Sequence, residues 1–143
     1  MTPEQVRLIQ TSFALVLRDG TRTSNLFYSR LFELDPSLRP LFRGDLEAQG
    51  RKFIEMLDVT MGDLTRLETI LPAVRRLGQR HREYGVLDAH YDTVGGALLW
   101  ALQETLQEYF TPEVFEAWAS AYTLVANTMK AAAREASSGI DLQ

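Results

Sequence analysis

The chain has 143 residues, of which 45% are hydrophobic, and a formal net charge of −4. This length suits one domain with a substantial core and room for one large prosthetic group. The chain contains no cysteine, which excludes disulfides, thiolate metal sites, iron–sulfur clusters and thioether-linked cofactors.

Helix signals divide the first half of the chain. Thr2-Pro3-Glu4-Gln5 combines a capping hydroxyl, a proline at the first helical position and a glutamine three residues after the cap. A helix is therefore predicted to begin there. Turn residues and prolines bound three further segments. The first helix ends at Asp19-Gly20, the second begins near Thr23-Ser24 and ends before Asp35-Pro36, a short segment covers Ser37 to Phe42, and the next helix covers about Asp45 to Met61.

The second half continues in the same way. A segment broken by Pro72 leads into a helix that contains His81 and stops at Gly85. A long helix covers about Ala89 to Tyr109, and Thr111-Pro112 begins the last one. Strand signals are almost absent, so we predict one all-α domain of seven or eight helices over residues 1–143, frayed from about 135 to 143. No apolar run is long enough to span a membrane and no signal peptide is indicated, so we expect a cytoplasmic protein.

His81 is one of only two histidines in the chain. Val74, Leu77 and His81 recur at helical spacing and share one face. A histidine that closes an apolar stripe is usually a core histidine or a cation at a helix end, and the alternative is a metal ligand. His90 lies nine residues further on, and therefore on a different face of any continuous helix.

Two more polar residues lie on apolar helix faces. Tyr28 follows Phe27, and Gln49 is in register with Phe53. Each either finds its own partner or shares one pocket with His81. An imidazole on one side, with a phenol and an amide on the other, would suit a metal-centred cofactor that holds a small polar diatomic ligand. The chain has no phosphate-binding glycine loop and no His-Glu-x-x-His motif, which disfavours nucleotide sites and protein-built zinc sites.

The chain has one basic cluster, formed by Arg75, Arg76, Arg80 and Arg82. One interpretation is the solvated side of a helix. The other is that one or two of these arginines meet a buried anionic ligand at the surface. A nucleic-acid-binding protein needs a concentrated basic face, and the net charge of −4 disfavours that function.

An ordered set of short segments runs along the chain: Phe27–Pro36 with Pro40-Leu41-Phe42, Gln49–Phe53, Leu77–His81, Tyr84-Gly85-Val86, His90-Tyr91, Val94-Gly95, and the spacing of Trp118 and Tyr122. In this order, from about residue 4 to residue 132, they resemble the globins. The similarity is greatest to the single-domain bacterial globins related to the haem domain of flavohaemoglobins and to neuroglobin. The resemblance implies a three-over-three sandwich of helices with haem b as cofactor.

The resemblance also implies a role for each matching residue. His81 is the proximal ligand to the haem iron, and Phe42 wedges the haem at its edge. Tyr28 and Gln49 form the distal pair, and Phe53 packs over the distal face as a gate for ligand size. The remaining implied cofactor contacts are Leu77, Tyr84, Val86, Tyr91 and Val94, with Lys52 or Arg80 at a haem propionate.

The implied function is reversible, high-affinity binding of oxygen, with carbon monoxide and nitric oxide as further ligands. A phenol O–H and an amide N–H both donate to the partly negative outer atom of a held oxygen molecule. The resemblance also implies nitric oxide dioxygenase activity, which needs a separate reductase because the 143 residues contain no flavin or nicotinamide domain. The alternative is a haem-based gas or redox sensor that signals to a separate partner protein. We expect no nucleic-acid or membrane partner, and a monomer or weak homodimer.

One position departs from the flavohaemoglobin pattern, which braces the proximal histidine with a tyrosine and a glutamate. Tyr91 matches the tyrosine, but Ala133 stands at the glutamate position and Glu135 is displaced onto another face. We therefore expect a weaker proximal push, which disfavours peroxidase-like chemistry. Glutamine ligates haem iron less readily than histidine, so Gln49 predicts a five-coordinate ferrous state, unlike that of neuroglobin.

Overall fold

Helices make up almost all of the described chain. The computed structural model describes residues 1–42, 44–62 and 67–141, without the side chains of 67–69 and 136–141. Six α-helices and two 3₁₀ segments lie within these residues, with no strand among them, so the predicted all-α class is confirmed. The elements are α1 (Pro3–Leu17), α2 (Gly20–Leu34), η1 (Pro36–Leu41), α3 (Leu46–Gly62), α4 (Leu67–Glu83), α5 (Asp88–Leu106), η3 (Gln107–Tyr109) and α6 (Pro112–Asp141).

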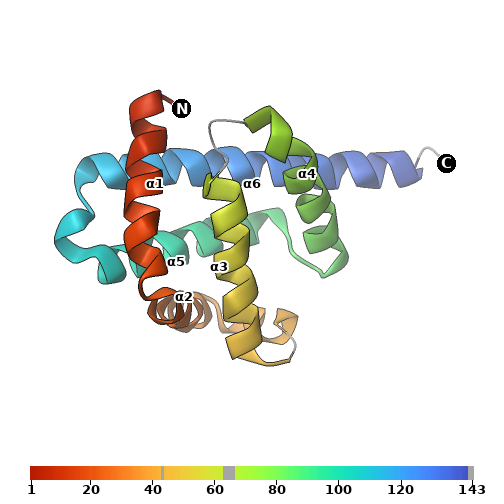
Figure 1. Cartoon of the computed structure of the whole chain (residues 1–143). Coiled ribbons are helices and arrows are strands. Elements are labelled where there is room, and N and C mark those ends of the chain that lie inside the picture. Colours follow the sequence, from red (N-terminus) through yellow and green to blue (C-terminus); the bar gives the residue numbers. More distant parts are fainter. Residues whose placement is uncertain (43, 63–66, 142–143) are drawn as a thin grey trace.

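The helices form two crossed layers. α1, α3 and α4 cross over α5 and α6, and α2 packs against both α3 and α5 (Figure 1). α6 is the longest described helix, and α1 and α4 both pack against it. This is the three-over-three sandwich that the resemblance implied. Within the part of the chain that the structure describes, no helix is long and apolar enough to cross a membrane.

The first helix begins as the sequence predicts. The Thr2 hydroxyl accepts a hydrogen bond from the Gln5 amide, and the Gln5 side chain accepts one from the Thr2 amide, each at 3.1 Å. Two of the four amides that a helix start leaves without helical partners are thereby satisfied.

Two helix boundaries differ from the prediction. α2 begins at Gly20 rather than near Thr23, because the Asp19 side chain accepts a hydrogen bond from the Arg22 amide and caps the helix there. α4 runs through Pro72 without a break, since its packing on α6 outweighs the local cost of a proline. α6 is helical to Asp141.

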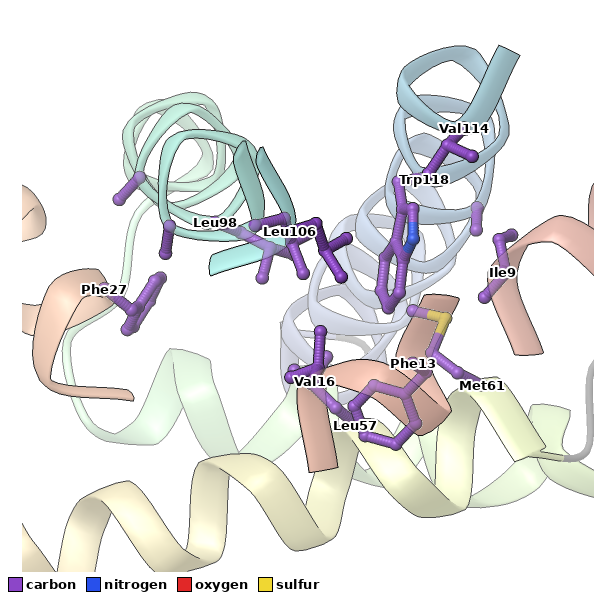
Figure 2. Close-up of a cluster of buried hydrophobic side chains, with 14 of the residues drawn as sticks. Ile9, Phe13, Val16, Phe27, Leu57, Met61, Leu98, Leu106, Val114 and Trp118 are labelled. Atoms are coloured by element: carbon purple, nitrogen blue, oxygen red, sulfur yellow. The ribbon is translucent and has the colours of Figure 1, made fainter. Parts of the chain in front are cut away.

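The main core is centred on Trp118 of α6, which is fully buried. Its indole N–H donates to the Ser12 hydroxyl at 2.9 Å, and that hydroxyl donates in turn to the Leu8 carbonyl at 2.7 Å. The Trp118 ring faces Phe13 of α1, with 6.1 Å between the ring centroids (Figure 2). Both buried polar groups are therefore satisfied inside an otherwise apolar core.

The buried apolar residues fall into two clusters. The larger, which we call the main cluster, includes Phe27 and Tyr28 of α2. The smaller, the α4 cluster, joins α4 to α5 and α6 through Val74, Tyr91, Ala126 and Met129. Half-buried Tyr122 touches both clusters. The helix that carries His81 thus rests on a core of its own, apart from the core that holds Tyr28.

Candidate functional site

His81 stands in the last turn of α4, and the backbone fixes the end of that helix. The Gly85 amide donates to the Arg82 carbonyl and the Val86 amide donates to the His81 carbonyl, each at 3.0 Å. Gly85 has a φ of +92°, which a residue without a Cβ adopts at little cost, and this pair of bonds is a common helix ending. The predicted glycine stop is confirmed, and it holds the His81 backbone in place.

The His81 ring is oriented by a carbonyl of its own helix. Its Nδ1 lies 2.8 Å from the Leu77 carbonyl oxygen. A carbonyl only accepts, so a hydrogen bond here puts the ring proton on Nδ1 and leaves the lone pair of Nε2 available to a metal. Burial lowers the pKa of the imidazole, and the Leu77 bond opposes this effect. The net result favours the neutral ring, which is the form that binds a metal.

α4 sits on α6 at close range. A Cβ added to Gly78 would lie 2.6 Å from the Cα of Met129, so a larger residue does not fit without a shift of the backbone. Arg75 forms an ion pair with Glu135 at the surface. Glu135 is therefore directed to Arg75 and not to His81, in keeping with the displacement seen in the sequence.

Tyr91 of α5 and Ala133 of α6 are the residues that the resemblance places behind His81, and both are uncharged. Tyr91 is buried, its carbonyl accepts a hydrogen bond from the Tyr122 hydroxyl at 2.6 Å, and the Lys130 ammonium lies 5.6 Å from its ring centroid. Ala133 is buried as well. No hydrogen bond within the described residues joins the Tyr91 hydroxyl or a carboxylate to His81. The neutral Leu77 carbonyl is thus the group that orients the ring.

Tyr28 faces α3 from the other side. Its side chain is 7% exposed, and its hydroxyl donates to the Gln49 carbonyl at 3.2 Å. Burial raises the pKa of the Tyr28 phenol to about 12, so the group is a neutral donor at physiological pH. Because the acceptor belongs to the backbone, the bond ties α3 to α2 whatever the side chain of residue 49.

Aromatic rings surround Tyr28. Phe53 stacks on Phe27 with 4.2 Å between the centroids. The Phe42 ring packs edge-on against the rings of Tyr28 and Phe32, with centroid distances of 5.4 Å and 5.5 Å. Tyr28, Phe53 and the predicted haem wedge Phe42 therefore belong to one packed group, contributed by α2, α3 and the end of η1.

A cavity of about 310 Å³ lies between α3 and α4. This volume falls at the lower end of small-molecule pockets, roughly 300–1,000 Å³. The Thr60 hydroxyl at its wall donates a hydrogen bond to the Met56 carbonyl at 2.8 Å. The lining residues are Met56, Val59 and Thr60 from α3, and Ile70, Ala73, Val74, Arg76, Leu77 and Arg80 from α4.

The predicted cofactor contacts lie in several different parts of the described structure. Leu77 and Arg80 line the cavity. Lys52 and Tyr84 are exposed, and 66% of Tyr84 is accessible. The others pack in the two clusters, with Val86 and Tyr91 in the α4 cluster, and Phe42, Phe53 and Val94 in the main cluster.

Seven of the nine lining residues were not predicted as cofactor contacts. Met56 and Thr60 follow Phe53 at helical spacing, so their position on the same face was a signal in the sequence. Arg76 lies one turn before Arg80, and both line the cavity. The sequence placed Arg76 in the basic cluster but did not distinguish it from Arg75.

Comparison with known proteins identifies the family. The family model described as Globin matches residues 25–129. The chain belongs to the globin family. A flavohemoprotein of Xylella fastidiosa is 30% identical over 132 residues, which are 90% of this chain and 33% of that protein. A flavohemoprotein of Bacillus subtilis is 26% identical over 125 residues, 85% of this chain and 31% of that protein. This globin therefore spans about a third of the length of the curated relatives it matches.

Solved structures show the same fold. A bacterial globin from Campylobacter jejuni has a TM-score of 0.85 at 23% identity and covers 96% of this chain and 99% of its own. A hexacoordinated haem protein from an anhydrobiotic tardigrade has a TM-score of 0.85 at 17% identity, over 94% of this chain and 96% of its own. The predicted globin fold is thereby confirmed.

Proposed function

We propose that this globin holds haem b and binds oxygen and other diatomic ligands reversibly. A bound haem would supply an iron that takes such a ligand, and His81 would be the residue that holds it. The observation that carries the proposal is the state of His81. Its Nδ1 is 2.8 Å from the Leu77 carbonyl oxygen, and a hydrogen bond there leaves Nε2 available to a metal. Leu77 itself lines the cavity.

The distal residues support binding of a polar ligand. The Tyr28 phenol of α2 and the Gln49 amide of α3 are neutral donors. A hydrogen bond to a partly charged ligand contributes roughly 1–3 kcal/mol. The Tyr28 hydroxyl already donates to the Gln49 carbonyl, so we propose that it changes acceptor when a ligand is present. Rotation about its C–O bond moves only the proton, and the ring stays packed.

We extend the proposal to nitric oxide dioxygenase activity supported by a separate reductase. Similarity to proteins named flavohemoprotein supports this extension. The surroundings of His81 agree with it, since a neutral carbonyl orients the ring and Glu135 is engaged by Arg75. Such a proximal side favours holding a ligand over cleaving a peroxide.

Absorption spectroscopy tests the proposal directly. The purified protein, with haemin added where needed, should show haem bands that shift with carbon monoxide after reduction. Removal of the haem should lower the melting temperature, because a ligand that binds only the folded state stabilises it. Stopped-flow mixing of the oxygenated protein with nitric oxide should then yield nitrate in equal amount. A protein that takes up no haemin contradicts the proposal as a whole, and one that forms no nitrate contradicts the dioxygenase extension.

A further inference from the structure

The cavity between α3 and α4 lies toward one end of the two helices. Its α3 lining begins at Met56, in the last turns of that helix, and its α4 lining begins at Ile70, in the first turn. His81 stands at the opposite end of α4, and Gln49 at the opposite end of α3. Neither of them lines the cavity, and Tyr28 of α2 does not line it either. The cavity is therefore distinct from the residues proposed to hold the haem and its ligand.

Apolar side chains form most of the cavity wall. They are Met56 and Val59 of α3, and Ile70, Ala73, Val74 and Leu77 of α4. Thr60 is the one uncharged polar residue in the described lining, and its hydroxyl already donates to the Met56 carbonyl at 2.8 Å. Val59 lines the cavity although 60% of it is accessible, so apolar surface stays exposed to water there. The interior thus favours a hydrocarbon ligand.

Two arginines supply the charges of the described lining, which contains no carboxylate. Arg76 and Arg80 are exposed and lie one turn apart on α4. Long side chains of a helix lean toward its N-terminus, which brings the Arg80 guanidinium back to the cavity. Neither arginine has an ion pair or hydrogen bond within the described residues, whereas Arg75 pairs with Glu135. Like charges at this spacing repel each other, and an anion bound to both would relieve the repulsion.

We propose that this cavity binds a medium-chain fatty carboxylate, with the chain against the apolar wall and the carboxylate at Arg76 and Arg80. The site is additional to the haem and does not rest on the proposed function. A cavity of about 310 Å³ has the volume of about ten water molecules at about 30 Å³ each. A methylene group occupies a similar volume, so a chain of about ten carbons fills the cavity. The planar fork of donors on a guanidinium matches a carboxylate.

Calorimetric titration of the haemin-loaded protein, reduced and saturated with carbon monoxide, tests the proposal. In this state the iron has no free position for a carboxylate, so any binding arises elsewhere. Decanoate should bind about tenfold more tightly than octanoate, because each buried methylene raises affinity about threefold to fourfold. Hexadecanoate should gain little beyond decanoate, since the cavity is then full. An affinity that keeps rising with chain length would indicate adsorption on apolar surface and would overturn the proposal.

Two glutamine variants test the head group. Arg76→Gln and Arg80→Gln should each weaken decanoate binding about threefold, and the double variant about tenfold, because exposed ion pairs are individually weak. Neutral decanol should bind wild type about tenfold more weakly than decanoate does, and the double variant should bind both alike. High salt should narrow the difference in wild type. Arg51→Gln removes an exposed arginine of α3 that pairs with Glu47 at 3.6 Å, and this control should bind decanoate like wild type.

A larger side chain in the wall tests the place of the hydrocarbon chain. Ala73→Leu fills part of the cavity and keeps both arginines, and leucine favours a helix nearly as well as alanine does. Decanoate should bind this variant about tenfold more weakly, and the haem bands should be unchanged. Ala89→Leu is the matched control, because Ala89 is an exposed residue of α5 that does not line the cavity. Equal decanoate affinity in the two variants would place the chain outside the cavity.

A competition experiment separates this site from the proposed haem site. Saturating decanoate should leave the haem bands and the rate of haemin release to a scavenging protein unchanged. If decanoate displaces haemin, the two ligands share one volume and the proposal is overturned. It is also overturned if the double arginine variant binds decanoate as wild type does. If the protein takes up no haemin, the proposed function fails, and the same titrations on the haemin-free protein should still show the dependence on chain length and on both arginines.

Discussion

The two helices that border the cavity are anchored by different kinds of contact. α3 is held on α2 by ring stacking, with 4.2 Å between the ring centroids of Phe53 and Phe27. α4 is held on α6 by the close approach at Gly78 and by the Arg75–Glu135 ion pair. The strength of ring stacking depends on the contact area and the shape of the rings. The close approach at a glycine requires the absence of a side chain, and the strength of a surface ion pair falls as the salt concentration rises. The two walls of the cavity can therefore be disturbed one at a time.

In the proposed function, different helices hold the cofactor and its ligand. The α4 wall supplies the imidazole that would hold the cofactor. Helices α2 and α3 supply the donors, Tyr28 and Gln49, that would hold its ligand. Changes to α4 should therefore alter cofactor retention, and changes to α2 and α3 should alter ligand dissociation. Each prediction below tests whether the two walls are separable in this way.

The largest effect is expected at His81. His81→Ala removes the imidazole whose Nε2 is left available by the hydrogen bond between Nδ1 and the Leu77 carbonyl. The purified variant should lose its haem bands and regain them with added imidazole, while its carbon monoxide dissociation rate, once restored, changes little. Normal haem retention in this variant would show that the cofactor is held from elsewhere.

His90→Ala is the matched control. The Nδ1 of His90 accepts a hydrogen bond from the Leu87 amide at 3.0 Å and so caps α5. Loss of such a cap costs about 1 kcal/mol of stability. The control should therefore melt at a lower temperature and yet keep its haem bands, which separates a helix cap from a metal ligand.

The next largest effect is expected where α4 packs against α6. Gly78→Ala places a methyl group 2.6 Å from the Cα of Met129 and close to its carbonyl. Overpacking of this kind costs about 1–3 kcal/mol. Urea unfolding should show that loss, with faster haemin release. Gly96→Ala is the control, because a Cβ there meets nothing within 4 Å and alanine favours a helix by about 1 kcal/mol over glycine. Equal stability of the two variants would mean that α4 shifts to make room.

A smaller effect is expected on the opposite wall. Tyr28→Phe keeps the ring and deletes the hydroxyl that donates to the Gln49 carbonyl. If that hydroxyl also serves the ligand, oxygen should dissociate about tenfold faster, equivalent to about 1.4 kcal/mol, with a smaller change for carbon monoxide. Haemin release should stay at the wild-type rate. An unchanged oxygen dissociation rate would mean that the hydroxyl remains on the Gln49 carbonyl.

Gln49→Leu examines the second donor on this wall. It removes the side-chain amide but leaves the backbone carbonyl that accepts from Tyr28, so the tie between α2 and α3 is kept. The effects of the two variants on oxygen dissociation should be non-additive in free energy, because both donors would serve one acceptor.

Local signals located most of the helices, and tertiary contacts decided the rest. The Thr2 capping box and the Gly85 stop need only neighbouring residues, and both were predicted. Asp19 and Thr23 are equally good caps by local rules, but the Thr23 hydroxyl lies 2.9 Å from that of Thr105 on α5 and has only a weak bond within its own helix. That contact depends on how α2 and α5 cross, so the start of α2 could not be read from the sequence.

The candidate site shows the same limit. The family resemblance and helical spacing placed Tyr28 and Gln49 on facing helices, but not the backbone carbonyl as the phenol's partner. The sequence grouped Arg75 with Arg76, although they are adjacent residues with different surroundings. Where α4 crosses α6, Arg75 forms an ion pair with Glu135, whereas Arg76 lines the cavity.

The smallest expected effect is the alkaline pH dependence of stability. Burial raises the pKa of the Tyr28 phenol to about 12 in the folded protein, whereas an unfolded tyrosine titrates near about 10. Between these values the unfolded chain releases a proton that the folded chain keeps, so this group's contribution, fully present below about pH 10, falls as the pH rises. The slope is at most about 1.4 kcal/mol per pH unit for a single proton. Urea unfolding from pH 8 to 11.5 should therefore show a steeper loss of stability for wild type than for Tyr28→Phe. Tyr109→Phe, which removes a side chain that is 59% exposed, should follow wild type. Parallel curves for wild type and Tyr28→Phe would mean that the phenol is solvated, and that the wall formed by α2 and α3 is looser than its stacked rings indicate.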